Sequence, residues 1–214
     1  IAVFDGVFGH LIADIELSAR ETLAQRLAAI PNAPPKVIRT LAFDDAIDVA
    51  GPVLTGSSQL DNVTLVENAR TKSQDHLLAI SRRKTLAETV TDVLVERGNR
   101  EVALTVVQNT GAKLSETGYV RLVKRSEGDD ELAQSVGMRL EIPRQQFLKL
   151  LTTASKAVRI ALEAAHPDKA SAVRHAVADV ATAIQAKAAA ASRNYAAAQA
   201  VVEQLCAVGK LTEG

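Results

Sequence analysis

Two consecutive stretches of equal length decide the fold: LAETVTDVLVERGNREVALTVVQNTGAK, residues 86–113, and LSETGYVRLVKRSEGDDELAQSVGMRLE, residues 114–141. Each opens with a leucine, carries a Leu-Val pair eight and nine positions later, and has a glycine in a polar break near its middle. A similar segment starts at Ile142, with Leu150 and Leu151 at the corresponding positions, and a weaker one starts at Leu60, so that four segments follow one another at nearly equal spacing. Repeats with a fixed period between about 20 and 50 residues are typical of stacked supersecondary units.

Each segment has the local signals of a helix, a tight turn and a second helix. The breaks RGNRE and EGDDE place a glycine where the first helix ends, followed by an Asn or Asp that is a good N-cap for the second. Asp61 and Ser115 are predicted N-caps for the first helices of their segments. Thr85 and Glu88 have the spacing of a capping box at the corresponding point.

The composition changes toward the end of the chain, and this change predicts the domain organisation. We expect a helical repeat domain over residues 1–165 and an Ala-rich helical pair over residues 166–214, packed on the repeat stack or continuing it. Residues 151–200 contain 20 alanines, and small side chains would let these helices self-associate. A helical stripe is formed by Val173, Val177, Val180 and Ile184. Because the chain begins at Ile1 without a Met, we expect a fragment of a longer repeat protein or a disordered start.

Charge and composition restrict the classes of function. The chain has 25 Lys or Arg and 25 Asp or Glu, and residues 60–141 contain 12 basic and 13 acidic side chains. A nucleic-acid binder normally shows a basic footprint, so nucleic acid is not an expected partner. No apolar run approaches the ~20 residues that span a bilayer, and no signal peptide is recognisable. The lone Cys206 is interpreted as a buried thiol, and we expect a reducing cytoplasm.

The stretch VVQNTGAKLSETG, residues 106–118, has the strongest claim to be a ligand site. A phosphate loop requires G-x-x-x-x-G-K-[ST] between a strand and a helix, and neither the spacing nor the helical context fits. As a joint between helices, almost every polar or small residue of the stretch has a structural role. Asn109 or Gly111 would end one helix in the left-handed conformation, Leu114 would staple onto Tyr119, and Ser115 would cap the next helix. Lys113 alone has no structural role in this interpretation.

No other constellation predicts catalytic, cofactor-binding or metal-binding residues. The four histidines lack metal-ligand spacing and are His10, His76, His166 and His175. Asp75 and His76 are interpreted as solvated residues at a helix start. The basic stretch SRRKT, residues 81–85, is interpreted as stabilising a helix C-terminus through the helix dipole. A contact for a phosphate or an acidic partner remains the alternative for that stretch.

The segment HLLAISRRKTLAETVTDVLVERGNREVALTVVQNTGAKLSETGYVRLVKRSEGDDELAQSVGMR, residues 76–139, resembles the bacterial domain-of-unknown-function family 2336, found mainly in alphaproteobacteria. The upstream LAFDDAIDVAGPVL, residues 41–54, is similar to that family as well. This resemblance implies an all-helical, HEAT-like or leucine-rich-variant-like repeat fold. It implies no activity and no site residues.

These observations predict an all-α protein, a right-handed α-solenoid of stacked helix-turn-helix repeats. Such folds usually act through extended surfaces. We therefore expect a non-catalytic protein-protein interaction or scaffold module, with a partner that the sequence does not identify. The alternative is nucleic-acid binding by the concave surface of a HEAT-like stack, and the balanced charge argues against it.

Overall fold

A computed structural model describes residues 16–167 and Gln204. The chain divides into two compact units, residues 1–162 and 163–214. The predicted all-helical fold is confirmed for the described residues, which form eleven helices and no strand. The predicted Ala-rich pair lies almost wholly outside the described residues, as do His10, His175 and Cys206.

The helices are short and follow one another closely along the chain. Their bounds are α2 Leu17–Ala28, α3 Pro35–Ala42, α4 Ile47–Gly56, α5 Asn62–Thr71, α6 Gln74–Ser81, α7 Glu88–Arg97, α8 Arg100–Gln108, α9 Glu116–Arg125, α10 Asp130–Gly137, α11 Arg144–Thr153 and α12 Lys156–Ala165. The four repeating segments correspond to the pairs α5–α6, α7–α8, α9–α10 and α11–α12. Each predicted segment is therefore one helix pair.

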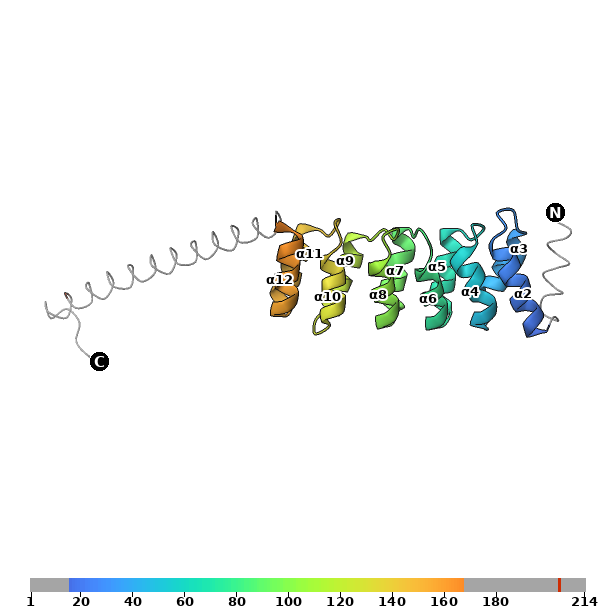
Figure 1. Ribbon diagram of the computed structural model, residues 1–214, viewed down its shortest axis with the longest axis horizontal. Coiled ribbons are helices and arrows are strands. Elements are labelled where there is room, and N and C mark those ends of the chain that lie inside the picture. The colour runs from blue at the N-terminus through green and yellow to red at the C-terminus, as the bar shows by residue number, and fades with distance from the viewer. Residues whose placement is uncertain (1–15, 168–203, 205–214) are drawn as a thin grey trace. The chain divides into compact units, whose positions relative to one another are not determined.

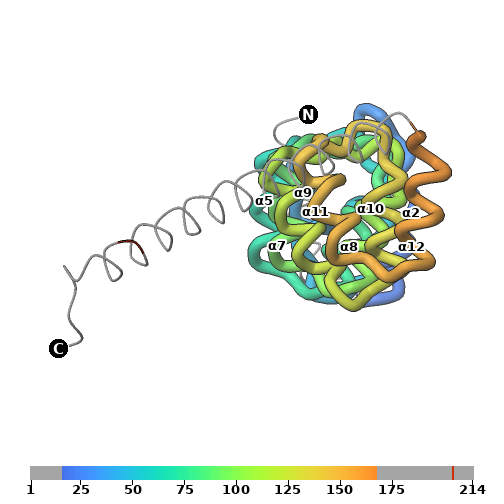
Figure 2. The backbone as a smooth tube through the Cα atoms, turned by 90° about the vertical axis from the view of Figure 1, so that its left-hand side faces the viewer, coloured from blue at the N-terminus to red at the C-terminus, as the bar shows by residue number. Residues whose placement is uncertain are grey.

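Helices two apart along the chain pack against each other, which produces two rows (Figure 1). The odd-numbered row contains α5, α7, α9 and α11, and the even-numbered row runs from α2 through α4, α6 and α8 to α10. Figure 2 looks along this stack, with α5 and α7 on one side and α10 and α12 on the other. Each helix thus has one face toward the other row and one outer face toward solvent.

The Leu-Val pairs of the repeat lie at the centre of this packing. Leu94, Val95, Leu122 and Val123 are fully buried. In the pair α5–α6 the corresponding residue is Asn68, which is also fully buried and donates from its side-chain amide to the backbone oxygen of Ala42 at 2.7 Å. A buried amide must find a partner, so the weak first copy of the pattern is explained by a polar contact with α3.

Most of the predicted caps are confirmed. Asp61 and Ser115 accept hydrogen bonds from the backbone three residues later, as do Asn99 and Asp129. The predicted capping box is wrong, because the N-cap of α7 is Ala87 and no side chain bonds there. Gly128 is the one described residue with a positive φ, +81°, which is the conformation that favours glycine after a helix.

Arginines of each pair reach back to the preceding pair and bind carbonyl oxygens at the end of one of its helices or in the loop that follows it. Such terminal carbonyls have no partner within their own helix and carry partial negative charge, so guanidinium groups suit them well. The contacts are Arg83 to Leu54 and Ser57, Arg97 to Ala69, Arg125 to Val95, and Arg139 to Val107, Asn109 and Ala112. These bonds tie successive pairs together along both rows.

Candidate functional site

The joint of residues 106–118 is occupied by contacts within the protein. The Asn109 side-chain amide donates to the backbone oxygens of Ser81 at 2.9 Å and Arg83 at 2.7 Å, which lie at the end of α6. Gly111 passes so close to the backbone of Lys84 that an added Cβ would lie 1.9 Å from its oxygen. Asn109 has an extended backbone, with φ −75° and ψ 105°, and Gly111 has no positive φ, so the predicted left-handed ending is wrong.

The rest of that joint is held by the neighbouring helix α7. Thr91 donates from its hydroxyl to the backbone oxygen of Lys113 at 2.6 Å. Ser115 donates to a carboxylate oxygen of Asp92 at 2.5 Å and accepts from the Gly118 amide. The hydroxyl, amide and glycine groups that looked like a ligand cradle are thus used between repeats.

The three basic side chains of the stretch SRRKT differ in their surroundings: one is half-buried and two are exposed. Arg83 donates to the oxygens of Leu54 at 2.5 Å and Ser57 at 2.8 Å, and burial lowers the pKa of its guanidinium. Arg82 and Lys84 are exposed. Arg83 therefore makes the predicted kind of contact with the C-terminal end of a helix. That helix is the neighbouring α4 and not α6, which directly precedes the basic stretch.

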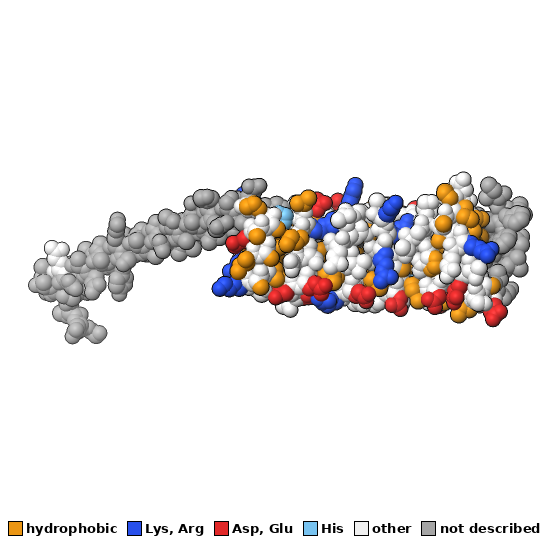
Figure 3. Space-filling view, viewed as in Figure 1, with side chains coloured by type: hydrophobic (Ala, Val, Ile, Leu, Met, Phe, Trp, Pro, Cys, Tyr) orange, Lys and Arg blue, Asp and Glu red, His pale blue; other side chains and the backbone are white. Residues whose placement is uncertain are grey.

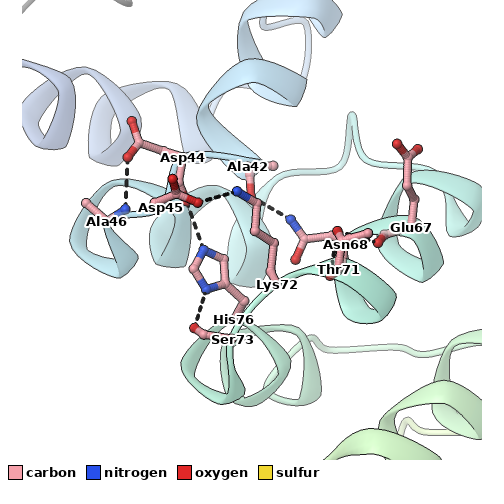
Figure 4. A network of polar contacts seen from close by, with 10 residues as sticks. All are labelled: Ala42, Asp44, Asp45, Ala46, Glu67, Asn68, Thr71, Lys72, Ser73 and His76. Atoms are coloured by element: carbon pink, nitrogen blue, oxygen red, sulfur yellow. Dashed lines mark hydrogen bonds and ion pairs between the residues drawn. The ribbon is translucent and has the colours of Figure 1, made fainter.

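His76 is buried, so its interpretation as a solvated helix-start residue is wrong. Its Nε2 lies 2.9 Å from the backbone oxygen of Asp44, and its Nδ1 lies 2.8 Å from the Ser73 hydroxyl (Figure 4). Beside it, Lys72 pairs with Asp45 at 2.6 Å and lowers the pKa of that carboxyl. With both ring nitrogens occupied, His76 serves as a connector between two turns of the stack.

Three of the four carboxylates of the EGDDE turn are also engaged. Arg100 pairs with Asp129 at 2.6 Å and Glu131 at 2.7 Å, and its hydrogen bond holds the pKa of the Asp129 carboxyl below the usual value. Asp130 accepts a hydrogen bond from the Ser155 hydroxyl at 2.8 Å. Within residues 16–167, no group of three or more His, Cys, Asp or Glu side chains is placed to hold a metal ion.

Charge is distributed unequally between the two rows, although the chain as a whole is neutral. The odd-numbered helices α3 to α11 contain nine Lys or Arg against five Asp or Glu. The interior even-numbered helices α4 to α10 contain one Arg against five Asp or Glu, whereas α2 and α12 at the ends each carry two basic and one acidic residue. Acidic side chains recur along the lower edge of the face in Figure 3, where these helices begin.

Two open grooves lie between neighbouring even-numbered helices, each with a volume of about 550 Å³. The groove between α4 and α6 has apolar walls from Ile47, Pro52 and Leu78. The groove between α8 and α10 is lined in part by Met138 and Leu140, whose exposed fractions are 41% and 81%. We call these the α4–α6 groove and the α8–α10 groove.

The sequence did not predict either groove, although the stretches 106–118 and 81–85 and Asp75 contribute lining residues and were interpreted in other ways. The helix register does relate them, because Leu78 and Ala79 occupy the same positions in α6 as Gln134 and Ser135 occupy in α10. That register shows which residues share a helix position, but whether two such positions from adjacent helices form a groove depends on their packing. The sequence therefore did not show which helix positions lie on the exposed outer face.

Among the described helices, none combines the length and the apolar character needed to cross a membrane. The model of a family described as uncharacterised proteins conserved in bacteria, domain-of-unknown-function family 2336, matches residues 49–214. No curated protein and no solved structure matches the chain. Because the family match covers more than half of its length, the chain belongs to domain-of-unknown-function family 2336.

Proposed function

We propose that this protein is a non-catalytic interaction module, a short right-handed α-solenoid of HEAT-like repeats that binds another protein. The observation that carries the proposal is the even-numbered row, whose outer face is open to solvent and carries two grooves two helix steps apart. Repeat stacks of this kind bind partners across several neighbouring units. A partner surface would therefore contact α4, α6, α8 and α10 together.

The polar contacts of the stack support this proposal. The most conspicuous polar side chains, which include Asn109, Ser115, His76 and Arg83, bond to neighbouring pairs and stabilise the scaffold. Helices held in this way present their outer faces in a fixed arrangement. Little conformational entropy would then be lost when a partner binds.

Affinity purification tests the proposal directly. The intact protein, tagged and expressed at its native level, is recovered from its own cells after mild cross-linking, with an unrelated tagged protein of similar size as the control. We expect at least one partner that is enriched in every replicate. If no partner is enriched and light scattering detects no self-association, the proposal is wrong.

The odd-numbered row favours a second candidate function, nucleic-acid binding. Its excess of basic side chains includes Arg70 and Lys124, which are exposed and have no ion pair within residues 16–167. Phosphate contacts would make such binding strongly dependent on salt. A mobility-shift assay at low salt should then show a complex that is weakened by Arg70→Ala with Lys124→Ala and unaffected by Lys113→Ala. Absence of a shift at low salt would exclude this candidate.

A further inference from the structure

We propose that the outer face of the even-numbered row binds a basic segment of a partner protein, which places one apolar side chain in the α4–α6 groove and another in the α8–α10 groove. This inference rests on the proposed interaction function and specifies the chemistry of the partner. Three features of the described residues carry it: two apolar grooves, unpaired carboxylates at the starts of the same row of helices, and the number of helix steps that separates the grooves.

The two grooves supply the apolar contacts. In the α8–α10 groove, Val107, Met138 and Leu140 form an apolar wall, and the side chains of Gln108 and Gln134 lie beside it. Amide side chains that both donate and accept suit the backbone of a bound peptide. In the α4–α6 groove, Ile47, Pro52 and Leu78 play the same part. When a partner covers exposed apolar side chains such as Leu140, apolar surface is removed from water, and this stabilises the complex.

The charge of this row selects a basic partner. Asp48, Asp75 and Glu101 lie in the first turns of α4, α6 and α8 and are exposed. No ion pair engages these three carboxylates within residues 16–167. Asp75 also lines the α4–α6 groove, opposite the exposed Arg82 at its far end, whereas Glu141 in the α8–α10 groove is paired with Arg139 at 3.6 Å. Lys and Arg side chains flanking the apolar anchors would meet these carboxylates, whereas an acidic segment would be repelled.

The spacing of the grooves sets the spacing of the anchors. The grooves are two helix steps apart in the even-numbered row, and neighbouring packed helices have axes about 8–10 Å apart, so the grooves are separated by roughly 16–20 Å. A helical partner rises about 1.5 Å per residue and would place its anchors about 11–13 residues apart. An extended partner would need a separation of about five or six residues.

A random peptide library displayed on phage, with peptides long enough for either separation, tests the inference on the intact protein. Expected clones combine Lys or Arg with two large apolar residues at one of these two separations. Enrichment of acidic peptides, or of no peptides, would overturn the proposal.

The clone with the highest affinity, made as a fluorescent synthetic peptide, then serves as the probe in anisotropy titrations. Met138→Gln with Leu140→Gln should weaken binding at least tenfold, because both side chains are already exposed and the change removes only the apolar contact. The matched control is Val63→Gln, an exposed apolar residue of α5 in the other row, which should change binding less than twofold. Equal losses for the two changes would contradict docking on the even-numbered row.

Charge reversal gives an independent result. Asp75→Lys with Glu101→Lys should weaken the same peptide at least tenfold at low salt and by much less at high salt. Glu116→Lys, in the first turn of α9 in the odd-numbered row, is the control. If a partner recovered from cells binds all of these variants as it binds the natural chain, this inference fails while the interaction function itself stands.

Discussion

Replacing Arg83 with methionine should destabilise the protein, whereas the same change at the adjacent Arg82 should not. Arg83 donates to two carbonyl oxygens at the end of α4, at 2.5 and 2.8 Å, and is half-buried. Arg82 is exposed, and its side chain forms no hydrogen bond within residues 16–167. Methionine preserves much of the apolar length of the arginine, so the comparison isolates the guanidinium contacts.

The expected magnitude follows from those two contacts. A hydrogen bond that involves a charged group contributes about 1.5–3 kcal/mol, so two at the lower end give about 3 kcal/mol. Because Arg83 is only half-buried, water can hydrogen-bond to the two carbonyl oxygens in the variant. The free energy of unfolding is therefore expected to fall by about 2 kcal/mol in Arg83→Met. An exposed surface change such as Arg82→Met usually costs within about 0.5 kcal/mol.

Urea unfolding of the full chain, followed by far-ultraviolet circular dichroism, measures both changes. The slope of the unfolding transition should be the same for all three proteins, because a changed slope would show that the stack no longer unfolds as one unit. A loss below about 0.5 kcal/mol for Arg83→Met, or equal losses for the two substitutions, would refute the argument that arginines hold the ends of neighbouring helices.

Two more predictions concern glycine and pH. Gly111→Ala should cost about 3 kcal/mol, since its Cβ would meet the Lys84 oxygen at 1.9 Å. Gly51→Ala, inside α4 with its nearest contact at 3.7 Å, should stabilise by about 0.5–1 kcal/mol. If urea unfolding shows Gly111→Ala to be more stable than Gly51→Ala, the close approach of Gly111 to the Lys84 backbone is contradicted. Asp129→Asn keeps an N-cap but loses the charge that pairs with Arg100, and should cost at most about 1 kcal/mol at pH 7. Because the pKa of Asp129 is lowered in the folded protein, this difference is present above about pH 4 and disappears as the carboxyl protonates below it. A difference unchanged at pH 2.5 would show that the charge is not responsible.

Sequence reasoning found most of the local structure because helix ends are determined by nearby residues. Asp61, Asn99, Ser115 and Asp129 cap helices through bonds to amides three residues away, and such contacts can be recognised from spacing alone. The buried Leu-Val pairs were found for a similar reason, since the period of a helix places them on one face. The capping box at Thr85 failed because α7 begins at Glu88 with Ala87 as its N-cap, and spacing alone did not distinguish the two possible starts.

The contacts between helix pairs could not be predicted from the sequence because they join residues that are far apart along the chain. His76 looked like a solvated residue at a helix start, yet the Asp44 carbonyl from the preceding pair covers it. Arg82 and Arg83 are identical in type and adjacent, yet only Arg83 points to the carbonyls at the end of α4. The charge difference between the rows also required knowing which helices lie side by side.

The sequence by itself determined the all-helical fold, the repeating helix pairs, most of the caps and the membership of the chain in its bacterial family. These features depend on periodicity and on contacts within one or two turns, which a linear pattern records. Only the tertiary structure decided which polar side chains bond to neighbouring helix pairs and which helix faces are exposed. Stacking placed helices with an excess of basic residues in one row and interior helices with an excess of acidic residues in the other. It also formed grooves between helices that do not follow each other in the sequence, because packing at a distance depends on three-dimensional geometry.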